Sequence, residues 1–371
     1  MTKILLSRQC LAVFLGLFAV SSTVAAGDLA SSLKKGKAEL KSAGALAFGP
    51  DGVLFVGDTQ SGSVWAIGTG DTAKADAMAA VDVEKLDKKV ADQLGVPASD
   101  ILINDMAINP ISGKAYLSVS RGRGPSAIPV ILQISGSSMK EVDLSSVPHA
   151  SVELPALPKA GAATKGQSQR NDAITDLAFF EGKLYVAGLS NEEFSSRLVS
   201  LDVPFKPTGQ GASVEIYHGA HGKYETKSPI RTFVTYKIAG QPHLLAAYTC
   251  TPLVKLPVKD LAPGTHVKGT TVAELGNRNR PLDMVVYSKD GKDYILMANS
   301  ARGVMKISTE GIASREGITK PVGGGGIAGQ PYETVAGLKG VDHLDRLDDA
   351  RAVILSKNES GAIDLKTIPL P

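Results

Sequence analysis

Cysteine is almost absent from this sequence, which has two cysteines in 371 residues. Two cysteines cannot build a disulfide framework, and no Cys-x-x-Cys, Cys-x-x-Cys-His or His-Glu-x-x-His string occurs. Zinc ribbons, c-type haem proteins and zincin proteases therefore have no sequence support. Cys10 lies near the N-terminus, and Cys250 ends an apolar run that we expect to be a buried strand.

A charge excess of one sign is also lacking. Lys plus Arg number 40 against 37 Asp plus Glu, for a net charge of +3. This balance does not indicate a polyanionic partner, and no aromatic residues alternate with the basic loops, so a nucleic-acid partner is not expected. The 43% hydrophobic and 21% charged residues are typical of a folded globular chain.

Long hydrophobic runs are confined to the N-terminus. Lys3 and Arg8 precede an apolar run over residues 11–20, and the small residues 21–26 follow it. Ten apolar residues are too few to cross roughly 30 Å of hydrocarbon, so the pattern predicts a signal peptide over residues 1–26, cleaved after Ala26. We expect residues 27–371 to form one domain, secreted or periplasmic, without a transmembrane segment.

One local pattern recurs six times at intervals of about 60 residues: an apolar run that ends in a small residue, a polar loop, then a second apolar run. Four short antiparallel strands per unit, apolar on both faces, are typical of β-propeller blades. The sequence therefore predicts an all-β, six-bladed β-propeller. One blade should be completed from the opposite terminus, with residues 38–41 placed to supply the strand.

A short helical insertion is expected between blades one and two. Residues 82–94 carry apolar side chains at 83, 86, 90 and 94, which lie on one stripe of a helix, and Gly95 and Pro97 follow. The pattern predicts a helix that packs on the outside of the ring.

Residues 55–64 and 296–305 resemble the strand, polar turn and strand of NHL and SMP-30/gluconolactonase-like six-bladed propellers. The resemblance implies the fold but not one activity, because such propellers include lactonases, quinoprotein sugar dehydrogenases and binding modules. The metal-binding glutamate that the lactonase type carries before its first blade strand is absent, since residues 42–44 are Ser-Ala-Gly. Asn109 occupies the place of the catalytic histidine of the soluble sugar dehydrogenases, and asparagine cannot accept that proton.

Three aspartates, Asp105, Asp176 and Asp283, precede the first strand of three different blades. The first strands are innermost in a propeller, so these carboxylates should converge at one end of the central channel. Together with oxygens of Asn104 and Asn279, they could hold a divalent cation such as calcium. Alternatively, each aspartate only accepts backbone N–H bonds in its own blade.

Two further groups of polar residues could bind ligands. His218, His221 and Glu225 lie within eight residues, and imidazoles at this spacing can share a copper, zinc or iron ion. Arg121, Arg278 and Arg280 could bind a carboxylate or phosphate at the channel mouth. The alternative for the histidine segment is a plain glycine-containing loop. The alternative for the three arginines is that they are solvated loop charges.

These observations favour a secreted propeller that binds a small molecule or a protein at its central-channel face. One alternative is a lactonase-like metal-dependent hydrolase, in which a channel-bound divalent ion polarises a carbonyl and an aspartate acts as base. The other is a quinone-dependent dehydrogenase. The sequence leaves open whether the protein is an enzyme.

Overall fold

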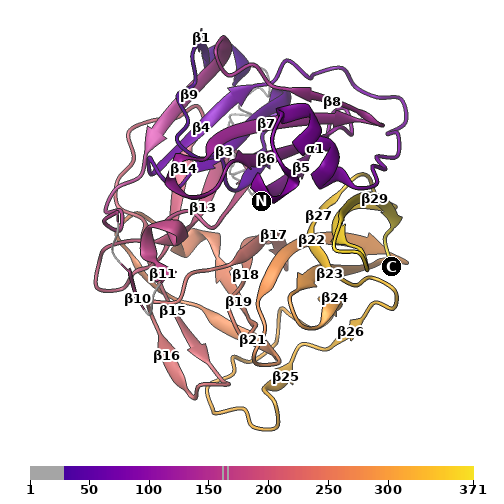
Figure 1. Ribbon diagram of the computed structural model, residues 1–371. Helices are drawn as coiled ribbons and strands as arrows, with labels where there is room; N and C mark the ends of the chain where they lie inside the picture. Colours follow the sequence, from indigo (N-terminus) through magenta and orange to yellow (C-terminus); the bar gives the residue numbers. More distant parts are fainter. Residues whose placement is uncertain (1–28, 161–162, 165–166) are drawn as a thin grey trace, which may run out of the picture.

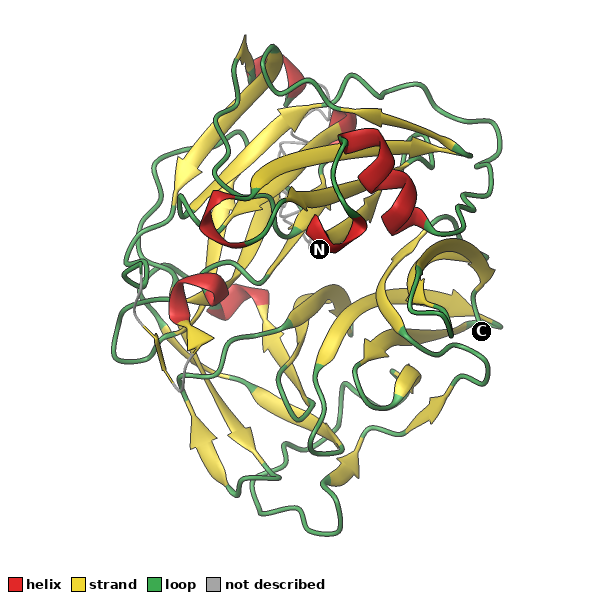
Figure 2. Ribbon diagram, in the orientation of Figure 1, coloured by secondary structure: helices red, strands yellow, loops and turns green. Residues whose placement is uncertain are grey.

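Antiparallel sheets surround a central channel in this computed structural model, which describes residues 29–160, 163–164 and 167–371 (Figure 1). The predicted signal peptide lies outside the described residues. Six sheets form the blades of the ring, so the predicted six-bladed β-propeller is confirmed. Figure 2 shows that strands and loops make up nearly all of the described chain, with few helical segments.

The first two blades contain the N-terminal strands. From the innermost strand outward, the first blade comprises β2 (Leu46–Phe48), β3 (Val53–Asp58), β4 (Ser63–Gly68), β9 (Val147–Glu153) and β1 (Lys34–Gly36). The second comprises β5 (Ile101–Ile108), β6 (Ala115–Arg121), β7 (Ile128–Ser135) and β8 (Ser138–Glu141).

The third and fourth blades are joined at their outer edges. The third comprises β12 (Asp176–Phe180), β13 (Lys183–Leu189), β14 (Ser196–Asp202) and β15 (Ala212–His218), whose outer edge pairs with β16 (Lys223–Glu225) and β20 (His266–Lys268). The fourth comprises β17 (Thr232–Ile238), β18 (Gln241–Ala247), β19 (Pro252–Pro257), β21 (Thr270–Leu275) and β25 (Ile327–Gly329). A short hairpin of β10 (Ala163–Thr164) and β11 (Gln167–Ser168) precedes the third blade.

The fifth blade has four strands and the sixth has three. The fifth comprises β22 (Pro281–Lys289), β23 (Lys292–Asn299), β24 (Gly303–Ser308) and β26 (Tyr332–Thr334). The sixth comprises β27 (Val341–Arg346), β28 (Arg351–Lys357) and β29 (Ile363–Pro369).

The order of blades around the ring differs from their order along the chain. The innermost strand β5 of the second blade contacts both β2 of the first and β27 of the sixth, whereas β2 also contacts β12 of the third. The second blade therefore lies between the first and the sixth. After forming it, the chain returns to the first blade, adds β9 beside β4, and only then enters the third blade.

Ring closure uses a segment that the sequence did not indicate. Val83 forms an antiparallel bridge with Leu365 of β29, with N–H to O distances of 2.8 and 2.9 Å, and so adds a short fourth strand to the sixth blade. The expectation that residues 38–41 would supply this strand is wrong. Those residues border the first blade, where the Ala38 N–H donates to Leu144, and the first blade does not adjoin the sixth.

The predicted helix is present as α1 (Leu86–Leu94), which packs against β5 and β29. It begins at Leu86 rather than at residue 82, because Val83 is engaged with β29. Leu86, Val90 and Leu94 are buried, and Gly95 ends the helix at a φ of 67°, a left-handed conformation that favours glycine.

Apolar clusters between adjacent blades form the core. Leu54 and Val56 of the first blade pack in one cluster with Tyr116 and Ile131 of the second. This packing explains why the strands are apolar on both faces, since each sheet is covered by a neighbour on either side. Cys250, expected in a strand, instead lies in the turn between β18 and β19 with a φ of 63°.

Replacing Val83 by proline should destabilise the ring, because it removes the N–H that donates to Leu365 and leaves a carbonyl unpaired in the sixth blade. An unmade buried hydrogen bond costs about 1–3 kcal/mol, which a urea or guanidinium unfolding curve resolves. Ala79→Pro, at an exposed position just before this segment, is the control and should change the unfolding free energy little. Equal stability of the two variants would contradict this closure.

Candidate functional site

One end of the channel is a cavity of 290 Å³ lined by residues from all six blades. Asp105 of β5, Asp176 of β12 and Asp283 of β22 line it, together with His343 of β27. The structure thus brings together the three carboxylates that the sequence placed at equivalent positions of three blades.

Each of these carboxylates joins two blades. Asp105 Oδ1 accepts the N–H of Met106 at 2.8 Å, and its Oδ2 accepts the N–H of Leu46 in the first blade at 2.7 Å. The same arrangement recurs twice: Asp176 binds Leu177 and Phe233 of the fourth blade, and Asp283 binds Met284 and Leu344 of the sixth. The hydrogen bonds to backbone N–H groups, which were the alternative to a calcium site, are therefore present. Each aspartate accepts one of them from its own blade and the other from a neighbouring blade.

A fourth aspartate, Asp345, repeats this arrangement deeper in the channel. It accepts the N–H of Arg346 and the N–H of Ile108 in the second blade, each at 2.7 Å. It lines a second channel cavity of 720 Å³, which Asp105, Asp176 and Asp283 also line, and it does not line the first. The sequence analysis missed it because the sixth blade carries His343 where the other three carry aspartate. The sequence feature that could have revealed it is the position of Asp345 itself, two residues after His343 in the same strand.

Burial and mutual repulsion raise the pKa of three of these four carboxyl groups. Burial, followed by the charge of Asp105, raises the pKa of Asp176 to about 7 and raises that of Asp283 well above its usual range. Burial raises the pKa of Asp345 to about 6. His343 Nδ1 lies 3.2 Å from Asp105 and 3.8 Å from Asp283, so a single imidazole faces this ring of acids.

Two arginines lie at the rim of the 290 Å³ cavity. Arg231 forms an ion pair with Asp172 at 2.7 Å. Arg280, one of the predicted ligand-binding residues, is exposed and makes no ion pair with any described residue. Although the side chain reaches solvent, partial burial of its guanidinium group and then the charge of Arg231 lower the pKa of Arg280, while the charge of Asp172 raises it. Arg231 was not singled out in the sequence, because no repeated motif marks it.

The other predicted ligand residues are placed differently. Asn104 lines the cavity, but its amide donates to the Ala43 carbonyl at 2.8 Å and to Ser120 Oγ at 2.9 Å. Asn279 is buried, and its amide donates to the Gly276 carbonyl. Asn279, Arg121 and Arg278 do not line the cavity.

Asn109 is engaged in a buried polar cluster. It is 0% exposed, its Nδ2 donates to the carbonyl and the carboxylate of Asp71, and its Oδ1 accepts the N–H of Ile111 at 2.9 Å. Both ends of the amide are therefore committed to holding the turn after β5, a structural role.

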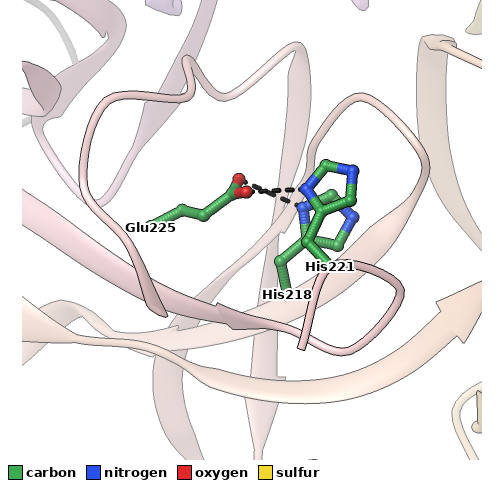
Figure 3. Close-up of side chains that lie close together, drawn as sticks. All are labelled: His218, His221 and Glu225. Atoms are coloured by element: carbon green, nitrogen blue, oxygen red, sulfur yellow. Dashed lines mark hydrogen bonds and ion pairs between the residues drawn. The ribbon is translucent and has the colours of Figure 1, made fainter. Parts of the chain in front are cut away.

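The predicted histidine cluster lies at the outer edge of the third blade, in the hairpin of β15 and β16. His218 Nδ1 lies 3.1 Å and His221 Nδ1 2.7 Å from the carboxylate of Glu225, with the two rings 3.9 Å apart (Figure 3). Burial raises the pKa of Glu225, but the hydrogen bonds from the two histidines and Ser228 outweigh burial and bring it to about 2. The structure thus brings these three residues together.

No protein-family model matches this chain. No curated protein matches it either. Among solved structures, an aldose sugar dehydrogenase from Streptomyces coelicolor in its PQQ-bound form matches at 12% identity and a TM-score of 0.32, covering 91% of this chain and 97% of that one. A glucose dehydrogenase matches at 13% identity and a TM-score of 0.34, over 91% and 98% of the two chains. A chain of the mitotic checkpoint complex matches at 9% and a TM-score of 0.38, over 98% and 99%. Likenesses this distant carry no argument about function.

The raised pKa of Asp176 makes a pH-dependent prediction. Because the folded state holds this proton more tightly than the unfolded state, Asp176 lowers stability progressively as the pH rises from about 4 to about 7. Asp176→Asn removes the titrating group and also one accepted N–H hydrogen bond. We therefore expect the substitution to destabilise the protein at pH 5 and to be less destabilising, or even stabilising, at pH 8. Thermal unfolding of both proteins across this range measures the change. A constant difference in melting temperature would show that Asp176 titrates normally.

Proposed function

We propose that this protein is a binding propeller whose channel mouth holds a small zwitterionic molecule. Its cationic group would lie against Asp105, Asp176 and Asp283, and its anionic group against Arg280. The observation that carries the proposal is the pairing, in one 290 Å³ cavity, of three half-buried carboxylates and the imidazole of His343 with Arg280, which makes no ion pair with any described residue.

The charged side chains of the cavity could bind both the cationic and the anionic group of such a ligand. A positive charge beside the carboxylates relieves their repulsion in a region of low dielectric, where opposite charges interact more strongly than in water. A guanidinium group binds a carboxylate or phosphate with two parallel hydrogen bonds. The 290 Å³ volume lies just below the roughly 300–1,000 Å³ of drug-sized pockets, which favours a ligand the size of an amino acid over a protein segment.

The proposal also covers the family of the propeller and its cellular compartment. We infer that residues 27–371 form a propeller related to the NHL and SMP-30/gluconolactonase-like proteins, on the strand and turn pattern of residues 55–64 and 296–305. We also infer secretion or a periplasmic location from residues 1–26. Among the described residues no helix is long and apolar enough to span a membrane. We do not extend the proposal to a sugar dehydrogenase, because the amide of Asn109 is fully engaged with Asp71 and Ile111.

A thermal-shift screen followed by calorimetry tests this function. The probes are the twenty amino acids, the diamine putrescine, the dicarboxylate succinate and calcium chloride. We expect an amino acid to raise the melting temperature most, because only a zwitterion satisfies both the carboxylates and Arg280. Arg280→Ala and Asp105→Asn should each weaken binding of the best amino acid at least tenfold.

Asp345→Asn is the matched control, because it removes the same kind of inter-blade carboxylate from a position outside the 290 Å³ cavity. It should alter stability but not affinity. Equal binding by wild type and Asp105→Asn, or stabilisation by succinate alone, would contradict the proposal. A larger effect of calcium than of any organic probe would instead favour the metal site predicted from sequence.

A further inference from the structure

The histidine hairpin of the third blade has its two rings held in one orientation. Glu225 accepts hydrogen bonds from Nδ1 of both His218 and His221, and its Oε2 also accepts the Ser228 hydroxyl at 2.8 Å. Nδ1 is therefore the protonated nitrogen of each neutral ring, and the lone pair is on Nε2. Figure 3 shows both Nε2 atoms on the side of the rings opposite to the carboxylate.

Two buried polar atoms at this loop have no hydrogen-bond partner among the described residues. His218 is 1% exposed, and its Nε2 makes no hydrogen bond. Glu274 is 0% exposed, and while its Oε1 accepts the N–H of Gly219 in the same loop, its Oε2 makes no hydrogen bond. Buried polar atoms are nearly always paired, so the Nε2 lone pair of His218 calls for a partner, and a metal ion is one to which it can donate.

We propose that this loop binds one divalent transition-metal ion through Nε2 of His218 and Nε2 of His221. The site is separate from the channel ligand proposed above. Glu225 is a positioning residue, which fixes the tautomer and direction of both rings as carboxylates behind metal-bound histidines do. Imidazole nitrogens favour zinc, copper or nickel over calcium or magnesium, which prefer oxygen.

The surroundings fit a cation at this position. The buried Glu274 adds a negative charge against the loop, through its bond to Gly219. The side chain of His221 is 47% exposed, so solvent can supply the remaining ligands. The carboxylate of Glu225 is a poorer candidate ligand than the Nε2 atoms, because both of its oxygens already accept hydrogen bonds.

A metal ion here would link segments that are far apart in the chain. The Gly219 carbonyl accepts the N–H of Val322 at 2.9 Å, and Glu274 belongs to β21 of the fourth blade. Binding would therefore hold the β15–β16 hairpin against the fourth blade and the loop at residues 321–326. This predicts a structural metal clip whose occupancy raises thermal stability.

Calorimetric titration of the metal-free full chain with zinc chloride tests the proposal. We expect one equivalent to bind and the melting temperature to rise. His221→Ala, a change at a half-exposed position that should leave the fold intact, should weaken zinc binding at least 100-fold. Glu225→Gln should weaken it about 10- to 100-fold, as loss of an orienting partner does. His243→Ala is the matched control and should bind zinc like wild type, since His243 is a half-buried histidine outside the hairpin whose Nδ1 bonds the Gln241 carbonyl.

Nitrogen-15 NMR of the histidine rings provides a measurement on the unaltered protein. Zinc should shift the Nε2 resonances of His218 and His221 while both Nδ1 atoms keep their protons. Equal zinc affinity of His221→Ala and His243→Ala would overturn the site. Loss of the Nδ1 protons on zinc binding would overturn the positioning role of Glu225, because the metal would then lie between the rings and the carboxylate.

Discussion

The hydrogen bonds from one carboxylate to two blades are the interaction on which this ring depends. Innermost propeller strands diverge from their neighbours, so no ladder between blades can satisfy the N–H groups that face the channel, and an unpaired buried N–H is costly. Asp105, Asp176, Asp283 and Asp345 each satisfy one N–H of their own strand and one of the next blade. The second blade is held on both sides in this way, by Asp345 of the sixth and by its own Asp105, which bonds the first.

These aspartates place several carboxylates close together in the channel, where water solvates them poorly. The backbone bonds favour the ionised carboxylates, while burial and the charge of Asp105 oppose ionisation, and the raised pKa of Asp176 and Asp283 shows that burial and repulsion win. The same side chains therefore hold the blades together and make the channel attractive to a cation. A ligand that neutralises them acts on stability as well as on occupancy.

The sequence predicts the features that repeat or are local and fails on those that depend on contacts between distant segments. Six similar units predict six blades, and the common position before three inner strands predicts Asp105, Asp176 and Asp283. The place of the second blade between the first and the sixth is fixed by inner-strand contacts and by β9, which no local pattern reveals. Asp345 and Arg231 were missed for the same reason: neither occupies the repeated position, and their roles appear only when the blades close. The paired orientation of His218 and His221 depends on Glu225 and likewise required the folded hairpin.

The two proposed sites would select ligands by different chemistry. In the channel, carboxylate oxygens already bonded to backbone N–H groups offer diffuse negative charge, which suits an organic cation, and Arg280 adds a directional group for an anion. In the hairpin, the Nε2 atoms of His218 and His221, whose Nδ1 atoms bond Glu225, would offer directional nitrogen donors that suit a transition metal. The first site belongs to inner strands and the second to an outer edge, so changes at one should add to changes at the other without coupling. The propeller therefore separates the groups that hold its blades together from a loop at its rim, and the rim can acquire or lose a ligand while the ring remains closed.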